Sequence, residues 1–198
     1  GNKLEHSGRD AIYRDTNIYV SDKKTAFGPK FGQGSALYEH HTTSLVFNDP
    51  PLHTRVRRIM TAALTPKALA RMEPGLIDVV DQLLDTMPRE PDLIDDFAAT
   101  IPVQIIGNLL DVPMTERGPL RDWSLAILGA LEPTLTQTQL EQGNRAVSEF
   151  KTYLQDLIAR RKATPGDPDT DVLTRLIFGD SHGELTENEL IHNCIFIL

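Results

Sequence analysis

The stretch that decides the fold is Asn48-Asp49-Pro50-Pro51-Leu52-His53-Thr54-Arg55-Val56-Arg57-Arg58. Asp49 is a fair N-cap residue, and the prolines after it stand where the backbone N–H that they lack would be unpaired. This predicts a helix over 53–64. His53 and Arg57 are four residues apart, so both lie on one face of that helix near its N-terminus, where the dipole and the free N–H groups favour an anion. An imidazole and a guanidinium there are suited to bind a carboxylate.

On spacing alone, an exposed basic helix is the favoured interpretation of this run, because arginine-rich segments usually face solvent. His53 and Arg57 are the candidate anion-binding residues in the other interpretation. The choice between the two therefore depends on what surrounds the run in the rest of the chain.

After this run, apolar residues recur at helical spacing along most of the chain. Thr65-Pro66 repeats the helix-start signal, and Glu73-Pro74-Gly75 is expected to break the helix that follows. The segment 100–110 is apolar on nearly all sides, which predicts a central, buried helix. Thr186, with Glu189 three residues later, forms a capping box that predicts the start of the last helix. Further helical stripes lie at 120–131, at about 138–162 and at 172–178.

The segment 28–48, ahead of the helix, contains several glycines among its aromatic residues. Its length and composition predict an irregular lid or binding loop. A short helix is expected over 8–14, and short strands are expected at 18–20 and 93–94. The segment 163–169 reads as a linker between the long helix and the next one. The sequence therefore predicts a mainly α protein with minor β structure.

Composition limits the possible partners. The chain has 198 residues, 40% of them hydrophobic, and 20 Lys and Arg against 28 Asp and Glu give a net charge of −8. A chain with this net charge lacks the positive potential that favours binding to nucleic acid or to an anionic membrane. No run reaches the roughly 18 apolar residues of a membrane span. The single cysteine, Cys194, excludes a disulfide framework and suits a reducing compartment. We therefore expect a cytoplasmic protein that binds neither nucleic acid nor membrane.

The run Asp-Pro-Pro-x-His-Thr-Arg-x-Arg-Arg resembles the start of helix C in bacterial soluble cytochromes P-450, which are haem-thiolate monooxygenases. The resemblance continues in order from helix B to the lead-in to helix I at Glu184-Leu185-Thr186-Glu187-Asn188-Glu189-Leu190. It implies a mainly α, truncated cytochrome P-450 fold, with helices B to H and the start of I, in one partial domain over 1–198. It also implies that His53 and Arg57 bind the propionates of haem b.

The resemblance further implies an oxidoreductase of EC 1.14 type, which oxidises a small organic substrate with O2 and electrons from a redox partner. In this family the loop before helix C lies over the distal haem face, here 28–48. Substrate contacts are then expected at His41, Thr43, Leu45 and Val46 and from the segment 128–135.

Basic residues on and after helix C have two interpretations. Solvated charge is the common one. The resemblance implies a docking patch for an acidic electron donor of the ferredoxin or flavodoxin type, where charge mainly raises the association rate. The candidate docking residues are Arg58, Lys67 and Arg71.

Three family motifs would all lie beyond Leu198: the Ala-Gly-x-Glu/Asp-Thr turn of helix I, the Glu-x-x-Arg pair and the Phe-x-x-Gly-x-x-x-Cys-x-Gly haem loop. By the same resemblance, the usual first strands and helix A would precede Gly1. We therefore expect a fragment that contains no catalytic residue and is inactive by itself. Cys194 lacks the glycine-rich loop of the thiolate ligand and is expected to be a small core residue.

Other function classes stay open at this point. An all-α ligand-binding transcription regulator is the main alternative, although the first fifty residues lack two helices joined by a short turn. A scaffolding helical domain is a third class. His40 and His41 are adjacent and diverge, so they are expected to be surface loop residues rather than metal ligands. Trp123 is expected to pack rather than to contact a cofactor.

Overall fold

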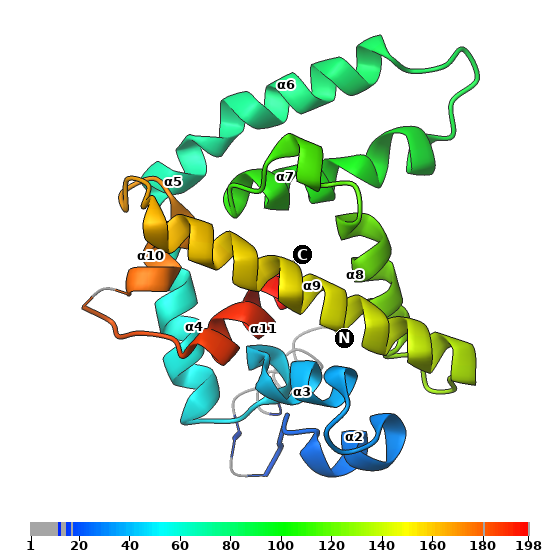
Figure 1. Ribbon diagram of the computed structural model, residues 1–198, viewed down its shortest axis with the longest axis vertical. Coiled ribbons are helices and arrows are strands. Elements are labelled where there is room, and N and C mark those ends of the chain that lie inside the picture. The colour runs from blue at the N-terminus through cyan, green and yellow to red at the C-terminus, as the bar shows by residue number, and fades with distance from the viewer. Residues whose placement is uncertain (1–11, 13–14, 17, 180, 198) are drawn as a thin grey trace, which may run out of the picture.

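The computed structural model describes residues 12, 15–16, 18–179 and 181–197, and this part of the chain is mainly helical (Figure 1). The predicted helix over 8–14 lies outside the described residues except for Ile12. In chain order the elements are α2 (Lys24–Phe31), α3 (Ala36–Thr43), η1 (Leu45–Phe47), α4 (Leu52–Ala63), α5 (Pro66–Ala70), α6 (Met72–Asp85), η2 (Leu93–Ala98), α7 (Thr100–Leu109), η3 (Met114–Glu116), α8 (Leu120–Gly129), α9 (Gln137–Ala163), α10 (Val172–Phe178) and α11 (Glu187–Ile197).

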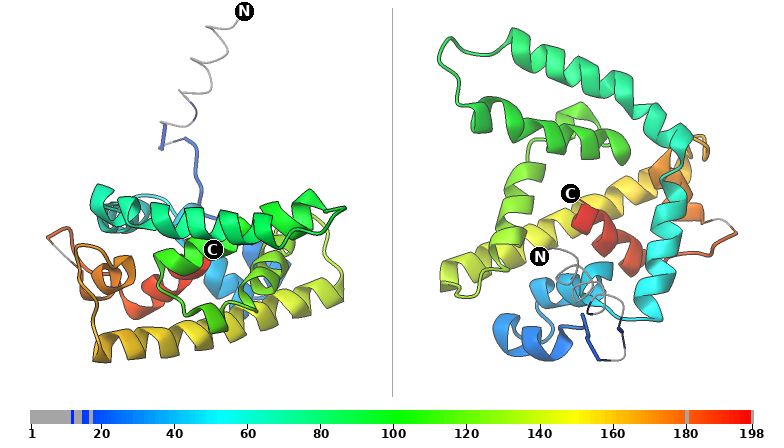
Figure 2. Two further views of the ribbon diagram at one scale, coloured as in Figure 1. Left: turned by 90° about the horizontal axis from the view of Figure 1, so that it is seen from above. Right: turned by 180° about the vertical axis from the view of Figure 1, so that it is seen from behind.

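The long helix α9 organises the core. It crosses the molecule and contacts α3, α8, α10 and α11 (Figure 1). Seen from above, α9 lies along one face and α6 along the opposite face, with α11 between them (Figure 2). The most deeply buried side chains come from these central helices and include Leu37, Val147, Phe150, Leu154, Leu173 and Ile191. No helix in the described ranges is both long and apolar enough to cross a membrane.

The predicted helix over 53–64 is confirmed as α4, but Asp49 does not cap it. Its carboxylate accepts the backbone N–H groups of Ser21 at 2.7 Å and Asp22 at 3.0 Å. These bonds lower the pKa of Asp49, and they fix the incoming chain beside the start of α4. The N-cap position is held by Pro51, without a side-chain hydrogen bond.

The prediction of an irregular segment over 28–48 is wrong, because two short helices occupy most of it. Gly32 and Gly34 both have φ of 83°, a conformation that costs glycine little, and they turn the chain between α2 and α3. The hydroxyl of Ser35 then accepts the N–H of Tyr38 at 3.1 Å and caps α3. The glycines mark a tight turn between helices rather than a long loop.

The break expected at 73–75 occurs earlier, at Arg71 between α5 and α6. Pro74 is the third residue of α6, within the first turn, where proline leaves no hydrogen bond unmade. Thr65 caps α5 by accepting the N–H of Ala68 at 3.0 Å.

The helix predicted over 100–110 is present as α7, but the prediction that it is central and buried is wrong. Only Gly107 and Leu109 of this helix are buried, and its other apolar residues are half-exposed. It packs against α6 at one end of the molecule (Figure 1). No strand forms at 18–20, and the residues at 93–94 belong to the π-helical turn η2.

The helices in the second half follow the sequence pattern closely. Gly179, with φ of 68°, ends α10. The capping box at the start of α11 is confirmed: the Thr186 N–H donates to the Glu189 carboxylate at 2.9 Å, and the Glu189 N–H donates to the Thr186 hydroxyl at 3.2 Å. The connection between α9 and α10 begins after Ala163, the last residue of α9.

Candidate functional site

One exposed side of α4 borders a cavity of about 460 Å³, called here the α4 cavity. His53 is half-buried, and Arg57, one helical turn later, is exposed. Within the described part of the chain, no hydrogen bond or ion pair joins the Arg57 guanidinium to a protein acceptor. The described residues that line the α4 cavity include no carboxylate; they are His53, Thr54, Arg57, Arg58, Thr61, Ala62 and His182.

The structure thus brings together the two residues predicted to bind an anion. The second arginine of the α4 cavity, Arg58, donates from its guanidinium to the backbone carbonyl of His182 at 3.2 Å. A cavity whose described lining contains two arginines and no acidic side chain is a favourable environment for a carboxylate. Because Arg57 is without a partner among the described residues, its planar fork is available for an anionic ligand.

A second, largely apolar cavity of about 280 Å³ lies between α3, η1, α8 and α11 and is called here the α11 cavity. His41 and Val46, two of the four predicted substrate residues, line it, as do Leu128 and Leu131 from the predicted segment 128–135. The described residues that line it are His40, His41, Val46, Phe47, Ser124, Ile127, Leu128, Leu131, Ile195, Phe196 and Ile197.

The other two predicted substrate residues do not line the α11 cavity. Thr43 is half-buried at the end of α3. The backbone N–H of Leu45 donates to the side-chain oxygen of Asn193 at 2.9 Å. This bond ties η1 to α11, so Leu45 helps to position the wall of the cavity from outside it.

The prediction that His40 and His41 are surface residues is wrong. Their side chains lie on α3 with 3% and 2% of the residue surface exposed, and their ring centroids are 4.8 Å apart. The imidazole of His192 on α11 is fully buried, with its centroid 5.6 Å from that of His40. The three histidines form a buried cluster beside the α11 cavity.

Burial keeps this histidine cluster neutral near pH 7. Desolvation lowers the pKa of His41 to about 4, with a smaller contribution from the nearby Lys30 ammonium. Burial also lowers the pKa of His40 well below its usual range and lowers the pKa of His192. Glu39 lies 3.5 Å from His192 Nε2 and also binds the Lys151 ammonium.

Several polar atoms in this region are buried and have no hydrogen-bond partner. They include Nδ1 of His40, Nε2 of His41 and Oγ of Ser124, all from residues that line the α11 cavity. Nδ1 of His192 and Oγ of Ser44 belong to the same set, whereas Nε2 of His192 has the Glu39 carboxylate 3.5 Å away. Native proteins leave few buried polar atoms unpaired, so this concentration requires an explanation.

The edge of the α11 cavity is held by a lysine from α2. The Lys30 ammonium donates to the backbone carbonyls of Leu131 at 3.0 Å and Glu132 at 2.7 Å, just beyond the end of α8. Backbone carbonyls at a helix C-terminus attract cations. We call this contact the Lys30 clamp; it joins α2 to the segment that follows α8.

Cys194 is a core residue, as predicted. Its side chain is fully buried on α11, and burial raises the pKa of the thiol to about 12. The thiol therefore stays protonated near pH 7 and is a poor metal ligand.

The predicted docking residues lie in the middle of α4, on α5 and at the junction of α5 with α6. Arg58 and Lys67 are exposed, and Arg71 follows at the junction of α5 and α6. The Lys67 ammonium pairs with Asp169 at 2.9 Å in a largely exposed contact. Part of the positive charge of this patch is therefore already compensated within the chain.

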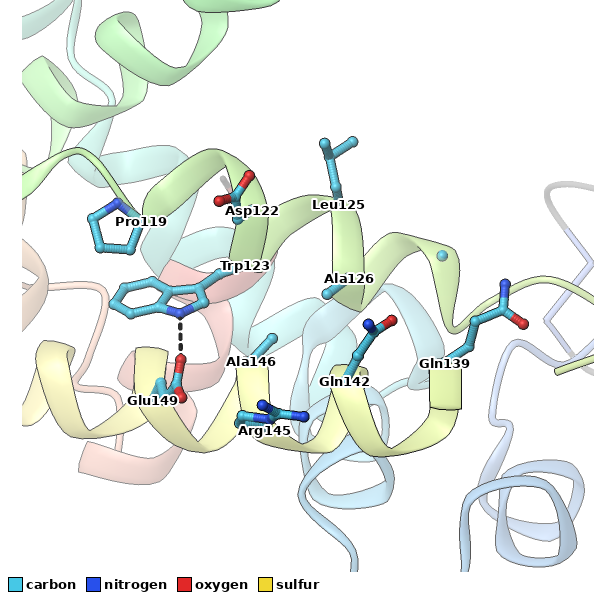
Figure 3. Close-up of a pocket in the computed structure, with 11 residues that line it drawn as sticks. Pro119, Asp122, Trp123, Leu125, Ala126, Gln139, Gln142, Arg145, Ala146 and Glu149 are labelled. Atoms are coloured by element: carbon cyan, nitrogen blue, oxygen red, sulfur yellow. Dashed lines mark hydrogen bonds between the residues drawn. The ribbon is translucent and has the colours of Figure 1, made fainter. Parts of the chain in front are cut away.

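A wider cavity, of about 660 Å³, lies between α8 and α9 (Figure 3). Its Trp123 donates from the indole N–H to Glu149 at 2.9 Å and stacks on Phe150 with centroids 5.0 Å apart. Trp123 thus packs between the two helices, as predicted. The indole N–H already has a hydrogen-bond partner within the protein. Trp123 therefore has no unpaired polar atom for a ligand, unlike the residues of the α11 cavity.

The sequence prediction missed His40, Ser124 and the α11 residues as cavity-lining groups. A signal for Ser124 was present: it precedes Ile127, Leu128 and Leu131 at spacings of three, four and seven, so it belongs to their helix face. A small polar residue within an apolar face indicates a polar contact. No local pattern indicated His40.

No protein-family model matches this chain. Among curated proteins, it is 26% identical over 191 residues to the biotin biosynthesis cytochrome P450 of Bacillus subtilis, covering 93% of this chain and 48% of that relative. It is 30% identical over 203 residues to the 6-deoxyerythronolide B hydroxylase of Saccharopolyspora erythraea, covering 94% of this chain and 48% of that relative. The chain spans about half the length of these curated relatives.

Solved structures give the same result. The crystal structure of CalO2 superposes with a TM-score of 0.83 at 26% identity, over 94% of this chain and 46% of that chain. Substrate-free CYP109E1 from Bacillus megaterium superposes with a TM-score of 0.79 at 26% identity, over 96% of this chain and 49% of that chain. The helical order and the sequence similarity agree, and the chain belongs to the bacterial cytochrome P450s, of which it forms a part.

Proposed function

We propose that this chain is part of a haem-dependent monooxygenase that oxidises a small organic substrate. The observation that carries the proposal is the α4 cavity, in which His53 and Arg57 share one helix face and no carboxylate belongs to the described lining residues. The relatives include an enzyme named as a hydroxylase, which supports an oxidising activity for the whole protein.

The residues of the α4 cavity fit haem b. The two propionates of haem b are carboxylates, and Arg57 offers a planar pair of donors to one of them. His53 supplies a second point of attachment from one turn earlier on α4. When bound, a thiolate-ligated haem supplies the activation of O2.

The α11 cavity is the proposed substrate site. His41 and Val46 would contact the substrate directly, as would Leu128 and Leu131, and the apolar lining would exclude water. Thr43 and Leu45 would support this wall without touching the substrate.

The thiolate ligand would come from outside these 198 residues. Cys194 does not fit that role, because its thiol is buried in the core of α11 and remains protonated. We therefore expect the chain to be inactive by itself.

Electrons would arrive from a ferredoxin or flavodoxin type of donor in the cytoplasm. The proposed docking residues are Arg58, Lys67 and Arg71, which are exposed cations on adjacent elements in an otherwise acidic chain. Charged residues at the edge of a protein–protein contact mainly raise the association rate of the two proteins.

The test compares the chain alone with the complete gene product, both expressed with haem supplied. The complete product is expected to bind haem, to give the red-shifted carbon monoxide band of a thiolate haem and to consume O2 with an oxidisable substrate. The chain alone is expected to lack that band. A complete product that folds without binding haem would refute the proposal, and a thiolate band from the chain alone would refute the role given to Cys194.

A further inference from the structure

His41 occupies a position where a phenylalanine would pack well. Its ring centroid lies 5.5 Å from that of Phe27, 5.2 Å from that of Phe31 and 5.5 Å from that of Phe47. In this aromatic setting the imidazole gains the same packing as a benzene ring but leaves Nε2 buried without a partner. The histidine is therefore unfavourable for the stability of the ligand-free protein.

The unpaired Nε2 of His41 is one of three such polar atoms in residues that line one cavity. His40 contributes Nδ1 from α3, and Ser124 contributes Oγ from α8, so the groups come from two different helices beside the α11 cavity. The rest of the lining is made of aliphatic residues and two phenylalanines. An apolar cavity with a few unpaired polar groups is typical of a site that selects both shape and hydrogen bonding.

No charged side chain is among the described residues that line the α11 cavity. Burial keeps both histidines neutral near pH 7. The nearest cation that affects His41, Lys30, already donates to two backbone carbonyls. A ligand carboxylate placed here would lose its hydration without gaining a counter-charge.

We propose that the α11 cavity selects a neutral, mainly apolar molecule that carries a hydroxyl or carbonyl oxygen, which hydrogen-bonds to His41, His40 and Ser124. This assignment rests on the proposed function for the role of the cavity as the substrate site. Beyond the proposed function, the assignment states which class of substrate binds and which residues of this chain select it.

The polar groups suit both kinds of oxygen. A neutral imidazole has one donor and one acceptor nitrogen, and a serine hydroxyl both donates and accepts. The χ2 torsion of histidine is broad and roughly two-fold, so a half-turn of either ring presents its nitrogen to the cavity without changing the packing shape. A pure hydrocarbon would leave these atoms unpaired, whereas an alcohol or ketone would satisfy them.

The experiment measures calorimetric binding of three matched probes to the complete protein, expressed with haem supplied, near neutral pH. The probes are decane, 2-decanone and decanoate. The ketone is expected to bind about tenfold more tightly than either the hydrocarbon or the carboxylate, which is the scale of one or two recovered hydrogen bonds.

Three variants locate the effect. His41→Phe, His40→Phe and Ser124→Ala are each expected to lower ketone affinity by several-fold up to about tenfold and to leave decane affinity equal or higher. The matched control is Leu128→Met, which changes the apolar wall at similar volume and is expected to affect all three probes alike. Ligand-free His41→Phe is expected to melt at the same temperature as wild type or higher.

Two outcomes would overturn the assignment: decanoate binding more tightly than 2-decanone, or a ratio of ketone to hydrocarbon affinity that stays unchanged in all three variants. Haem content is measured in the same samples. A protein without haem that still prefers the ketone would refute the proposed function but not the ligand class. A haem protein without that preference would refute the ligand class alone.

Discussion

The guanidinium of Arg55 on α4 binds the carboxylate of Glu189 in the first turn of α11. The same carboxylate accepts the backbone N–H of Thr186, and Arg55 also donates to the carbonyl of Glu184 at 3.2 Å. The Glu189 side chain is 12% exposed, against 38% for Arg55. One glutamate therefore both caps α11 and joins it to α4, the two helices that border the two candidate cavities.

Arg55→Ala is expected to lower the free energy of unfolding by about 1 kcal/mol, because a partly buried carboxylate loses its cation while the capping bonds remain. Urea unfolding measures the change. The matched control is Arg89→Ala, an exposed arginine that is expected to have almost no effect. Equal stability of the two variants would show that the pair does not join the helices.

Arg57→Ala is expected to weaken haem retention in the complete protein by about 2 kcal/mol, the value of charge-assisted hydrogen bonds at an exposed site. His53→Ala removes one weaker donor and is expected to cost about 1 kcal/mol, with the double variant worst. Haem loss through gel filtration and mild denaturant measures the order.

Arg89→Ala again serves as the control and is expected to keep its haem. Arg55→Ala is a poor control for this purpose, since Arg55 contributes to the contact between α4 and α11. Full haem retention in both Arg57→Ala and His53→Ala would refute the haem-binding role of α4. The helix would then be interpreted as an exposed basic helix.

The buried histidines are expected to make the fold labile to acid. Burial lowers the pKa of His41 from 6.5 to about 4, so between these values the unfolded chain binds a proton that the folded chain does not. Stability is therefore lost as the pH falls through this range, by about 3 kcal/mol from His41 alone. His40 and His192 act in the same direction.

His41→Phe removes this contribution, so its unfolding free energy is expected to fall less steeply than that of wild type from pH 6.5 to pH 4. Glu39 has a lowered pKa and faces His192, so it still contributes acid lability in both proteins. Urea unfolding at several pH values measures the difference. Parallel pH profiles for the two proteins would contradict the prediction.

Neutralising Arg58, Lys67 and Arg71 to glutamine is expected to slow electron delivery to the complete protein about tenfold at low salt, with substrate affinity nearly unchanged. The difference should shrink as salt rises. Because Lys67 already pairs with Asp169, Lys67→Gln alone is expected to have the smallest effect. An unchanged reduction rate at every salt concentration would remove the docking assignment, and Arg89→Gln is the control.

The parts of the fold that could be predicted are those fixed by contacts within a few residues. The capping box of Thr186 and Glu189 and the stop at Gly179 follow from local backbone chemistry, and the structure reproduces them. The turn between α2 and α3 is predicted only as part of a loop, because two glycines indicate positive φ without indicating whether helices flank them. The burial of α7 was overestimated, since an apolar sequence does not say which neighbours a helix has.

The candidate site could be predicted in part. His53 and Arg57 share a helix face by spacing alone, and the structure places both in one cavity. The burial of His40 and His41 could not be predicted, because it depends on the aromatic residues of α2 and η1 and on His192 of α11, which is about 150 positions away in the sequence. Such long-range contacts leave no local periodic pattern.

The Lys30 clamp is expected to affect how quickly a ligand of the proposed substrate site is exchanged. Leu131 lines the α11 cavity, and its backbone carbonyl accepts from Lys30, so the clamp lies at the edge of that cavity. Movement of this edge to admit or release a ligand would break the two hydrogen bonds of the clamp. We therefore expect Lys30, which is not among the described residues that line the cavity, to lengthen the residence time of a bound molecule.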